Sequence, residues 1–235
     1  MSDNKGLEYE KVLNKNLQSA GAQRANFRPA GSDSNAPDAE LRIRGYNHKV
    51  EVKLDTKVDF GQGSLDYDLK NKKWILGGAK TDSAVQMRKF LEAIGVPKMV
   101  NEAWGQYGPP KKFTVDAEYY SDSDVAHDYK YFKDVFVNIP KNSVEKYYNS
   151  KKTYYIQIGA GFGLYFMGED VADLKVPRFD LNLRLRIRLK RGGSMPIYNY
   201  RFTTAIQAVQ GSLNISNKNL DDKEFLKILG SISKK

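Results

Sequence analysis

The chain contains no cysteine and only two histidines, His48 and His127, among its 235 residues. Without cysteine it cannot form a disulfide, a thiolate zinc site or a cysteine nucleophile. Two histidines cannot supply a three-histidine metal site, and neither has a histidine partner at helical spacing. Any bound metal is therefore expected to be a hard cation held by oxygen ligands.

The sequence also lacks a long apolar run. Its least polar stretch, residues 154–167, contains Gln157 and several glycines. It falls short of the 18 or more apolar residues that a membrane-spanning helix requires. Residues 1–11 are acidic and polar, unlike the basic and then apolar start of a secretory signal. We therefore expect no membrane association and a cytoplasmic protein, bacterial or phage-encoded.

Positive charge exceeds negative charge, with 38 Lys and Arg against 28 Asp and Glu and a formal net charge of +10. Such an excess is typical of proteins that bind nucleic acid, although solubility alone also explains a basic surface. The composition is that of a globular protein, and the length predicts one compact domain spanning residues 1–235.

Two segments near the N-terminus show clear periodicity. Residues 6–20 repeat apolar side chains at helical spacing and precede Gly21, which predicts an amphipathic helix. Residues 41–54 alternate apolar and polar side chains around a bend at 45–47. This pattern predicts a β-hairpin whose apolar face packs on the helix. The alternating apolar residues of the hairpin are Leu41, Ile43, Val50, Val52 and Leu54.

The other face of this hairpin carries acidic residues next to a lysine. Glu51 and Lys53 are two residues apart and share one face of a strand, and Asp38 starts the preceding strand beside them. Two converging carboxylates can chelate Mg²⁺, and an adjacent ammonium can orient a water. The pattern therefore predicts phosphodiester hydrolysis. The alternative is an ordinary solvated strand face, with Asp38 as a turn former after Pro37.

The same residues resemble the PD-(D/E)XK nuclease superfamily. Pro37-Asp38 matches the PD element and Glu51-Val52-Lys53 matches the (D/E)XK element. Residues 6–10, GLEYE, resemble the GxxxE pattern of the family's first helix. Gln62 resembles the accessory polar residue that many members place after the lysine. The resemblance covers residues 6–65.

The resemblance implies an α/β fold with a restriction-endonuclease-like core, in which helices flank a mixed central β-sheet, plus an additional β-rich C-terminal portion. It implies a Mg²⁺ site, at which Mn²⁺ is expected to substitute. The implied ligands are the carboxylates of Asp38 and Glu51, the carbonyl oxygen of Val52 and, directly or through water, Glu10. Lys53 is expected to position the attacking water, with Gln62 as an accessory group.

The activity that the resemblance implies is metal-dependent hydrolysis of DNA, with an endonuclease of restriction or homing type preferred. An exonuclease or a junction resolvase of the same superfamily would carry the same residues. A homodimer is compatible with each of these.

A second signal lies in residues 178–191. Apolar residues alternate there with cations, which predicts a strand with one positively charged face. The cations are Arg184, Arg186, Arg188 and Lys190. Such a stripe can contact several DNA phosphates, although charged side chains also protect edge strands from aggregation. Two alternatives remain: a non-catalytic nucleic-acid-binding protein, or a protein that binds an acidic protein partner through this strand.

Shorter signals predict the remaining elements. They are a helix over 82–94, an irregular insertion over 101–130, a short helix over 143–148, a hydrophobic strand from Thr153, a tight turn over 159–163, and a closing helix over 221–229 that Gly230 ends.

Overall fold

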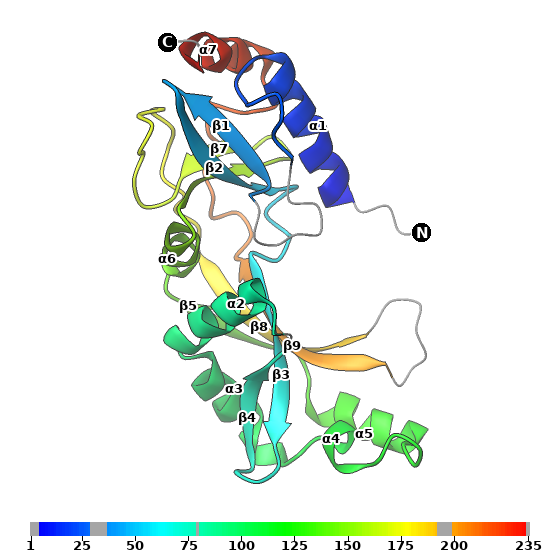
Figure 1. Ribbon diagram of the computed structural model, residues 1–235. Helices are drawn as coiled ribbons and strands as arrows, with labels where there is room; N and C mark the ends of the chain where they lie inside the picture. Colours follow the sequence, from blue (N-terminus) through cyan, green and yellow to red (C-terminus); the bar gives the residue numbers. More distant parts are fainter. Residues whose placement is uncertain (1–4, 29–36, 79, 192–198, 234–235) are drawn as a thin grey trace. The chain divides into compact units, whose positions relative to one another are not determined.

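The computed structural model describes residues 5–28, 37–78, 80–191 and 199–233 (Figure 1). Where the sequence predicts one compact domain, the chain divides into two compact units. Unit 1 comprises Met1–Val58, Lys141–Asn182 and Ala208–Lys235, and unit 2 comprises Asp59–Pro140 and Leu183–Gln207. Both units combine a β-sheet with helices, so the predicted α/β class is confirmed.

Unit 1 is built on a mixed four-stranded sheet in the order β1-β2-β6-β7. Strand β2 pairs antiparallel with β1 and parallel with β6, and β7 pairs antiparallel with β6. Its strands are β1 (Ala39–Ile43), β2 (Tyr46–Lys53), β6 (Thr153–Ile158) and β7 (Gly163–Phe166). Its helices are α1 (Lys5–Ser19), α6 (Ser143–Ser150) and α7 (Lys223–Ser233).

The predicted β1–β2 hairpin is present and turns in two residues. Arg44 and Gly45 have φ angles of 48° and 82°, the left-handed conformation that a tight two-residue hairpin turn requires. The apolar face of the hairpin packs on α1, as expected from the alternation. The shared core includes Leu13, Leu17, Leu41, Ile43, Val50 and Val52.

Helices α1 and α7 lie side by side over β1 (Figure 1). The prediction that Gly230 ends the closing helix is wrong, since α7 continues to Ser233. A Cβ atom on Gly230 would lie 1.9 Å from the carbonyl oxygen of Ala20. This glycine is therefore a point of close approach between α7 and the residues that follow α1.

The predicted strand from Thr153 and the tight turn after it are confirmed as β6 and the β6–β7 hairpin. Ala160 and Gly161 adopt positive φ angles of 52° and 84° in this turn. Strand β6 runs parallel to β2, so the chain must cross over between them. Unit 2 residues Asp59–Pro140 and helix α6 occupy that crossover.

Unit 2 holds a five-stranded sheet in the order β4-β3-β9-β8-β5. Its strands are β3 (Gly61–Asp68), β4 (Lys73–Gly77), β5 (Val135–Ile139), β8 (Leu183–Arg191) and β9 (Tyr200–Ala208). Its α-helices are α2 (Asp82–Ala93), α3 (Val96–Trp104), α4 (Lys111–Thr114) and α5 (Asp122–Tyr131), with a 3₁₀ turn, η1, at Gly105–Tyr107. The predicted β-rich C-terminal portion thus contributes strands to two different sheets.

The core of unit 2 is aromatic. Trp74 contacts Trp104, Phe132 and Phe202 with ring centroids 5.0 to 5.5 Å apart, in tilted or edge-to-face arrangements. The prediction of an irregular insertion over 101–130 is wrong, because short helices fill most of this range. At the start of α5, for example, Ser121 and Asp124 form a reciprocal capping box.

None of the helices in the described part of the chain is both long enough and apolar enough to cross a membrane.

Asp128 of α5 is fully buried, and its carboxylate accepts three hydrogen bonds from other elements of unit 2 and lies 3.1 Å from Nδ1 of the neighbouring His127. Its donors are the N–H groups of Lys111 and Lys112, at 2.8 and 3.0 Å, and the Tyr200 hydroxyl at 2.6 Å. Asp128→Ala leaves these donors without an acceptor, so we expect it to lower the free energy of unfolding by about 2–4 kcal/mol. Urea denaturation measures this, with Tyr200→Phe expected to have a smaller effect. A loss equal to that of Tyr200→Phe would contradict this account.

Candidate active site

The register of the β1–β2 hairpin brings the predicted acidic residues together in unit 1. Ala39 pairs with Val50, so Asp38, one residue earlier, lies opposite Glu51. The Asp38 carboxylate accepts a hydrogen bond from the Val52 N–H at 2.9 Å, which fixes its position against β2. The Lys53 ammonium lies 2.5 Å from the Glu51 carboxylate.

These charged groups lie at a largely desolvated position. The side chains of Lys53 and Glu51 are only 19% and 13% exposed, and Asp38 is half-buried. Burial raises the pKa of Asp38 to about 7, and the charge of Glu51 adds to this rise. The Lys53 charge and the Val52 N–H oppose the rise without cancelling it. Asp38 therefore releases its proton near neutral pH.

Glu10 of α1 belongs to the same electrostatic cluster. Burial raises the pKa of the Glu10 carboxyl, the charge of Lys53 lowers it, and the charge of Glu51 raises it again. Burial of Lys53 by itself lowers the pKa of the ammonium, but the charges of the three carboxylates outweigh that effect and raise it. Three carboxylates around one ammonium leave an excess of negative charge, which a divalent cation would neutralise.

A residue that the sequence did not single out, Tyr148 of α6, completes the cluster. Its buried hydroxyl donates a hydrogen bond to Glu51 Oε1 at 2.8 Å. Burial, together with the charge of Glu51, raises the pKa of Tyr148 well above its ordinary value, so the hydroxyl keeps its proton and remains a donor. Tyr148 lies 97 residues from Glu51 in the sequence, and only the pairing of β2 with β6 brings α6 to this position.

Gln157 is a second residue that sequence reasoning missed. It is fully buried and pairs with Val52 across the parallel β2–β6 ladder. Its amide nitrogen donates to the hydroxyl oxygen of Tyr9 at 3.1 Å and to Asn219 Oδ1 at 2.8 Å. Tyr9 precedes Glu10 on α1, so this network fixes the helix that carries Glu10 against the sheet that carries Glu51.

The remaining predicted residues lie in unit 2. Gln62 is exposed on β3 and accepts a hydrogen bond from Lys190 at 3.3 Å, so it belongs to a different unit from Asp38 and Glu51. The predicted cationic strand is present as β8. Two of its cations are paired with acids, Arg186 with Asp134 and Arg188 with Asp59.

The donor chemistry of the unit 1 cluster fits Mg²⁺, which prefers carboxylate, carbonyl and water oxygens. Across the described residues, no three Asp, Glu or His side chains are close enough together to form a metal site by themselves. A cation would therefore rely on Asp38 and Glu51, with the remaining positions filled by a backbone carbonyl, water or substrate oxygens. That is the open coordination that hydrolysis of a phosphodiester needs.

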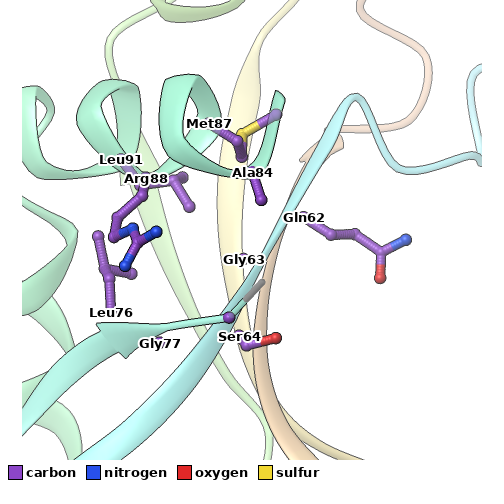
Figure 2. Close-up of a pocket in the computed structure, with 10 residues that line it drawn as sticks. Gln62, Gly63, Ser64, Leu76, Gly77, Ala84, Met87, Arg88 and Leu91 are labelled. Carbon is purple, nitrogen blue, oxygen red and sulfur yellow. The ribbon is translucent and has the colours of Figure 1, made fainter. Parts of the chain in front are cut away.

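Unit 2 contains a pocket of about 220 Å³ between α2 and strands β3 and β4 (Figure 2). Its walls include Gly63, Leu76, Gly77, Met87, Arg88 and Leu91. A Cβ atom on Gly63 would lie 2.4 Å from the Leu91 side chain, so the glycine lets α2 approach the sheet. In Figure 2 the Gln62 side chain points away from Arg88 and Leu76. No carboxylate is among the lining residues that the structure describes, so this pocket does not offer a second metal site.

Comparison with protein-family models, curated proteins and solved structures finds no match for this chain.

Without a bound cation, the raised pKa of Asp38 makes stability depend on pH. The ordinary value of 3.8 applies to the unfolded chain and about 7 to the folded one. Between these values the folded state binds more protons, so the contribution of Asp38 to the free energy of unfolding falls as pH rises from 4 to 7. Asp38→Asn removes this dependence. We therefore expect the difference in free energy of unfolding between the variant and wild type to shift in favour of the variant by about 1–3 kcal/mol as pH rises from 4.5 to 8.

Denaturant titrations in EDTA at the two pH values measure this gain. Glu169→Gln, at an exposed position of unit 1, is the matched control and is expected to show little pH-dependent difference from wild type. An Asp38→Asn effect that is the same at both pH values would contradict the raised pKa.

Proposed function

We propose that the protein is a magnesium-dependent deoxyribonuclease of the PD-(D/E)XK type, acting as an endonuclease. The observation that carries this proposal is the convergence of Asp38, Glu51 and Lys53 on one hairpin, with the Asp38 carboxylate bonded to the Val52 N–H. These residues occupy the positions of the PD and (D/E)XK elements. A mixed sheet with flanking helices, as the resemblance implies, supports the same assignment.

Asp38 and Glu51 would hold the cation, with the Val52 carbonyl as a further ligand and Glu10 acting directly or through water. When bound, the cation would polarise the scissile phosphate and lower the pKa of a bound water. Both Tyr148 and Lys53 contact Oε1 of Glu51, so these two residues would hold the Glu51 carboxylate in place for the cation. Lys53 would orient the attacking water and stabilise the negative charge that develops on the phosphate.

The net positive charge of the chain supports a polyanionic substrate. The cations of β8 provide a separate reason to expect DNA binding, and they also fit the alternative of a nucleic-acid-binding protein without catalysis. The two functions differ in the fate of the DNA. Only the nuclease yields shortened or nicked products that depend on Glu51.

The test of this function compares wild type with Glu51→Gln on closed circular duplex, linear duplex and circular single-stranded DNA. We expect Mg²⁺-dependent nicking of the closed circle by wild type, no cleavage in EDTA, and a rate at least about 10³-fold lower for Glu51→Gln. Glu169→Gln serves as the exposed control. Cleavage confined to linear ends would make the enzyme an exonuclease, and equal DNA binding without cleavage by either protein would favour the binding function.

Tyr148→Phe tests the positioning of Glu51. The variant keeps the ring but loses the hydrogen bond to the carboxylate. We therefore expect its Mg²⁺ affinity or its activity to fall about 10- to 100-fold, while its DNA affinity in EDTA stays unchanged. The Mg²⁺ concentration at half-maximal nicking is the measurement that separates this role from a purely structural one. Tyr46→Phe, on an exposed residue of the same β2 strand, is the control. An unchanged Mg²⁺ requirement would remove Tyr148 from the site.

A further inference from the structure

The sheet of unit 2 has one face covered by helices and one polar face. Met87 and Leu91 of α2 approach the sheet at Gly61 and Gly63, and Gly63 pairs with Thr204. Rings from two other helices, Phe113 of α4 and Trp104 of α3, contact Phe202, which lies on the same side of β9 as Thr204. The helix contacts therefore fall on one side of the sheet.

The cationic stripe of β8, made of Arg184, Arg186, Arg188 and Lys190, lies on the opposite side. Gln207 and Arg188 both bond to Asp59, and Lys190 bonds to Gln62. Gln62 pairs with Ala205, whose side of β9 is the reverse of the Thr204 side. Along β8, Leu183, Leu185 and Ile187 are buried, whereas the arginines between them are partly exposed. The polar face thus carries the whole cationic stripe.

Phe136 interrupts this polar face with an exposed aromatic ring. It lies on β5, the strand at one edge of the sheet, directly opposite Arg186. The Phe136 side chain is 49% exposed, in contrast to the buried aromatic residues on the helix-covered face. The guanidinium carbons of Arg184 and Arg186 lie 4.2 and 5.8 Å from its ring centroid. A ring held by two arginines is a preorganised surface for stacking another planar group.

The cations divide into two kinds. Arg186 and Arg188 are neutralised by Asp134 and Asp59. Arg184 stacks on Phe136 and Lys190 bonds to neutral Gln62, and neither has an acidic partner among the described residues. These two cations are six residues apart on β8, or about 20 Å along an extended strand. The cationic stripe therefore offers two uncompensated positive charges, with an aromatic ring beside one of them.

This combination fits single-stranded DNA better than duplex DNA. Phosphates of either form would be attracted by Arg184 and Lys190. The faces of bases in a duplex are covered by their neighbours, whereas an unpaired base can stack on an exposed ring. We propose that Phe136, Arg184 and Lys190 form a binding site for single-stranded DNA, in which a base stacks on Phe136 and backbone phosphates contact the two cations. This inference rests on the proposed nuclease function, and it makes DNA with an unpaired segment the substrate class of the enzyme.

The test measures binding of a fluorescent single-stranded oligonucleotide and of a matched duplex by anisotropy, in EDTA so that no cleavage occurs. We expect Phe136→Leu to weaken single-strand binding about tenfold, with duplex binding changed less than twofold. Phe136→Tyr should retain wild-type affinity because it keeps an aromatic ring. Tyr119→Leu, at another exposed aromatic of unit 2, is the control and should also bind normally. Arg184→Gln should weaken binding of both DNA forms and reduce its salt dependence.

Single-strand binding that is unaffected by Phe136→Leu, or no preference for single strands in wild type, would overturn the proposal. If polyglutamate binds as tightly as single-stranded DNA and its binding also depends on Phe136, the face binds an acidic protein partner, and the proposal is overturned as well. Glu51→Gln should bind single strands at least as well as wild type. If wild type cleaves DNA but Phe136→Leu binds normally, only this proposal fails; if the Phe136 effect is seen without any cleavage, only the nuclease proposal fails.

Discussion

The candidate site depends on the register of β2, which is fixed on both sides. On one side the two-residue turn at Arg44 and Gly45 and the bond from the Val52 N–H to Asp38 align the strand with β1. On the other side a parallel ladder aligns it with β6. A slip of one residue would exchange the two faces of β2 and send Glu51 and Lys53 into the apolar core. The fold therefore admits one register, and that register assembles the acidic cluster.

The hairpin and its acidic face could be predicted because their determinants are local. Alternation with period two, a glycine in the turn and the positions of Asp38 and Glu51 all fall within the 17 residues 38–54. Tyr148 could not be predicted, because its contact requires a strand pairing that spans an inserted unit. The prediction that α7 ends at Gly230 was wrong for a related reason. In a sequence, a glycine that ends a helix cannot be told from a glycine that permits close packing.

The ionic groups of the two units have different effects on the folded state. In unit 1, carboxylates are gathered at a position with little access to water, which raises the pKa of Asp38 and opposes folding at neutral pH. A cation that binds these carboxylates in the folded state would offset this loss of stability. In unit 2, Asp59 and Asp134 each pair with one arginine of β8, which holds those side chains in place and reduces their mutual repulsion.

Unit 1 is assembled from three separated stretches of chain, and α1 packs against α7. During synthesis on a ribosome, the hairpin with Asp38 and Glu51 emerges long before β6, Tyr148 and α7. The stretch Asp59–Pro140 leaves the ribosome in between. The sheet of unit 2 is complete only after Leu183–Gln207 has also been translated. Tyr148 and β6 complete the acidic cluster, so the cluster cannot be complete on a nascent chain before residues 141–158 have been translated. Vectorial synthesis thus separates the formation of the hairpin in time from the completion of the candidate site.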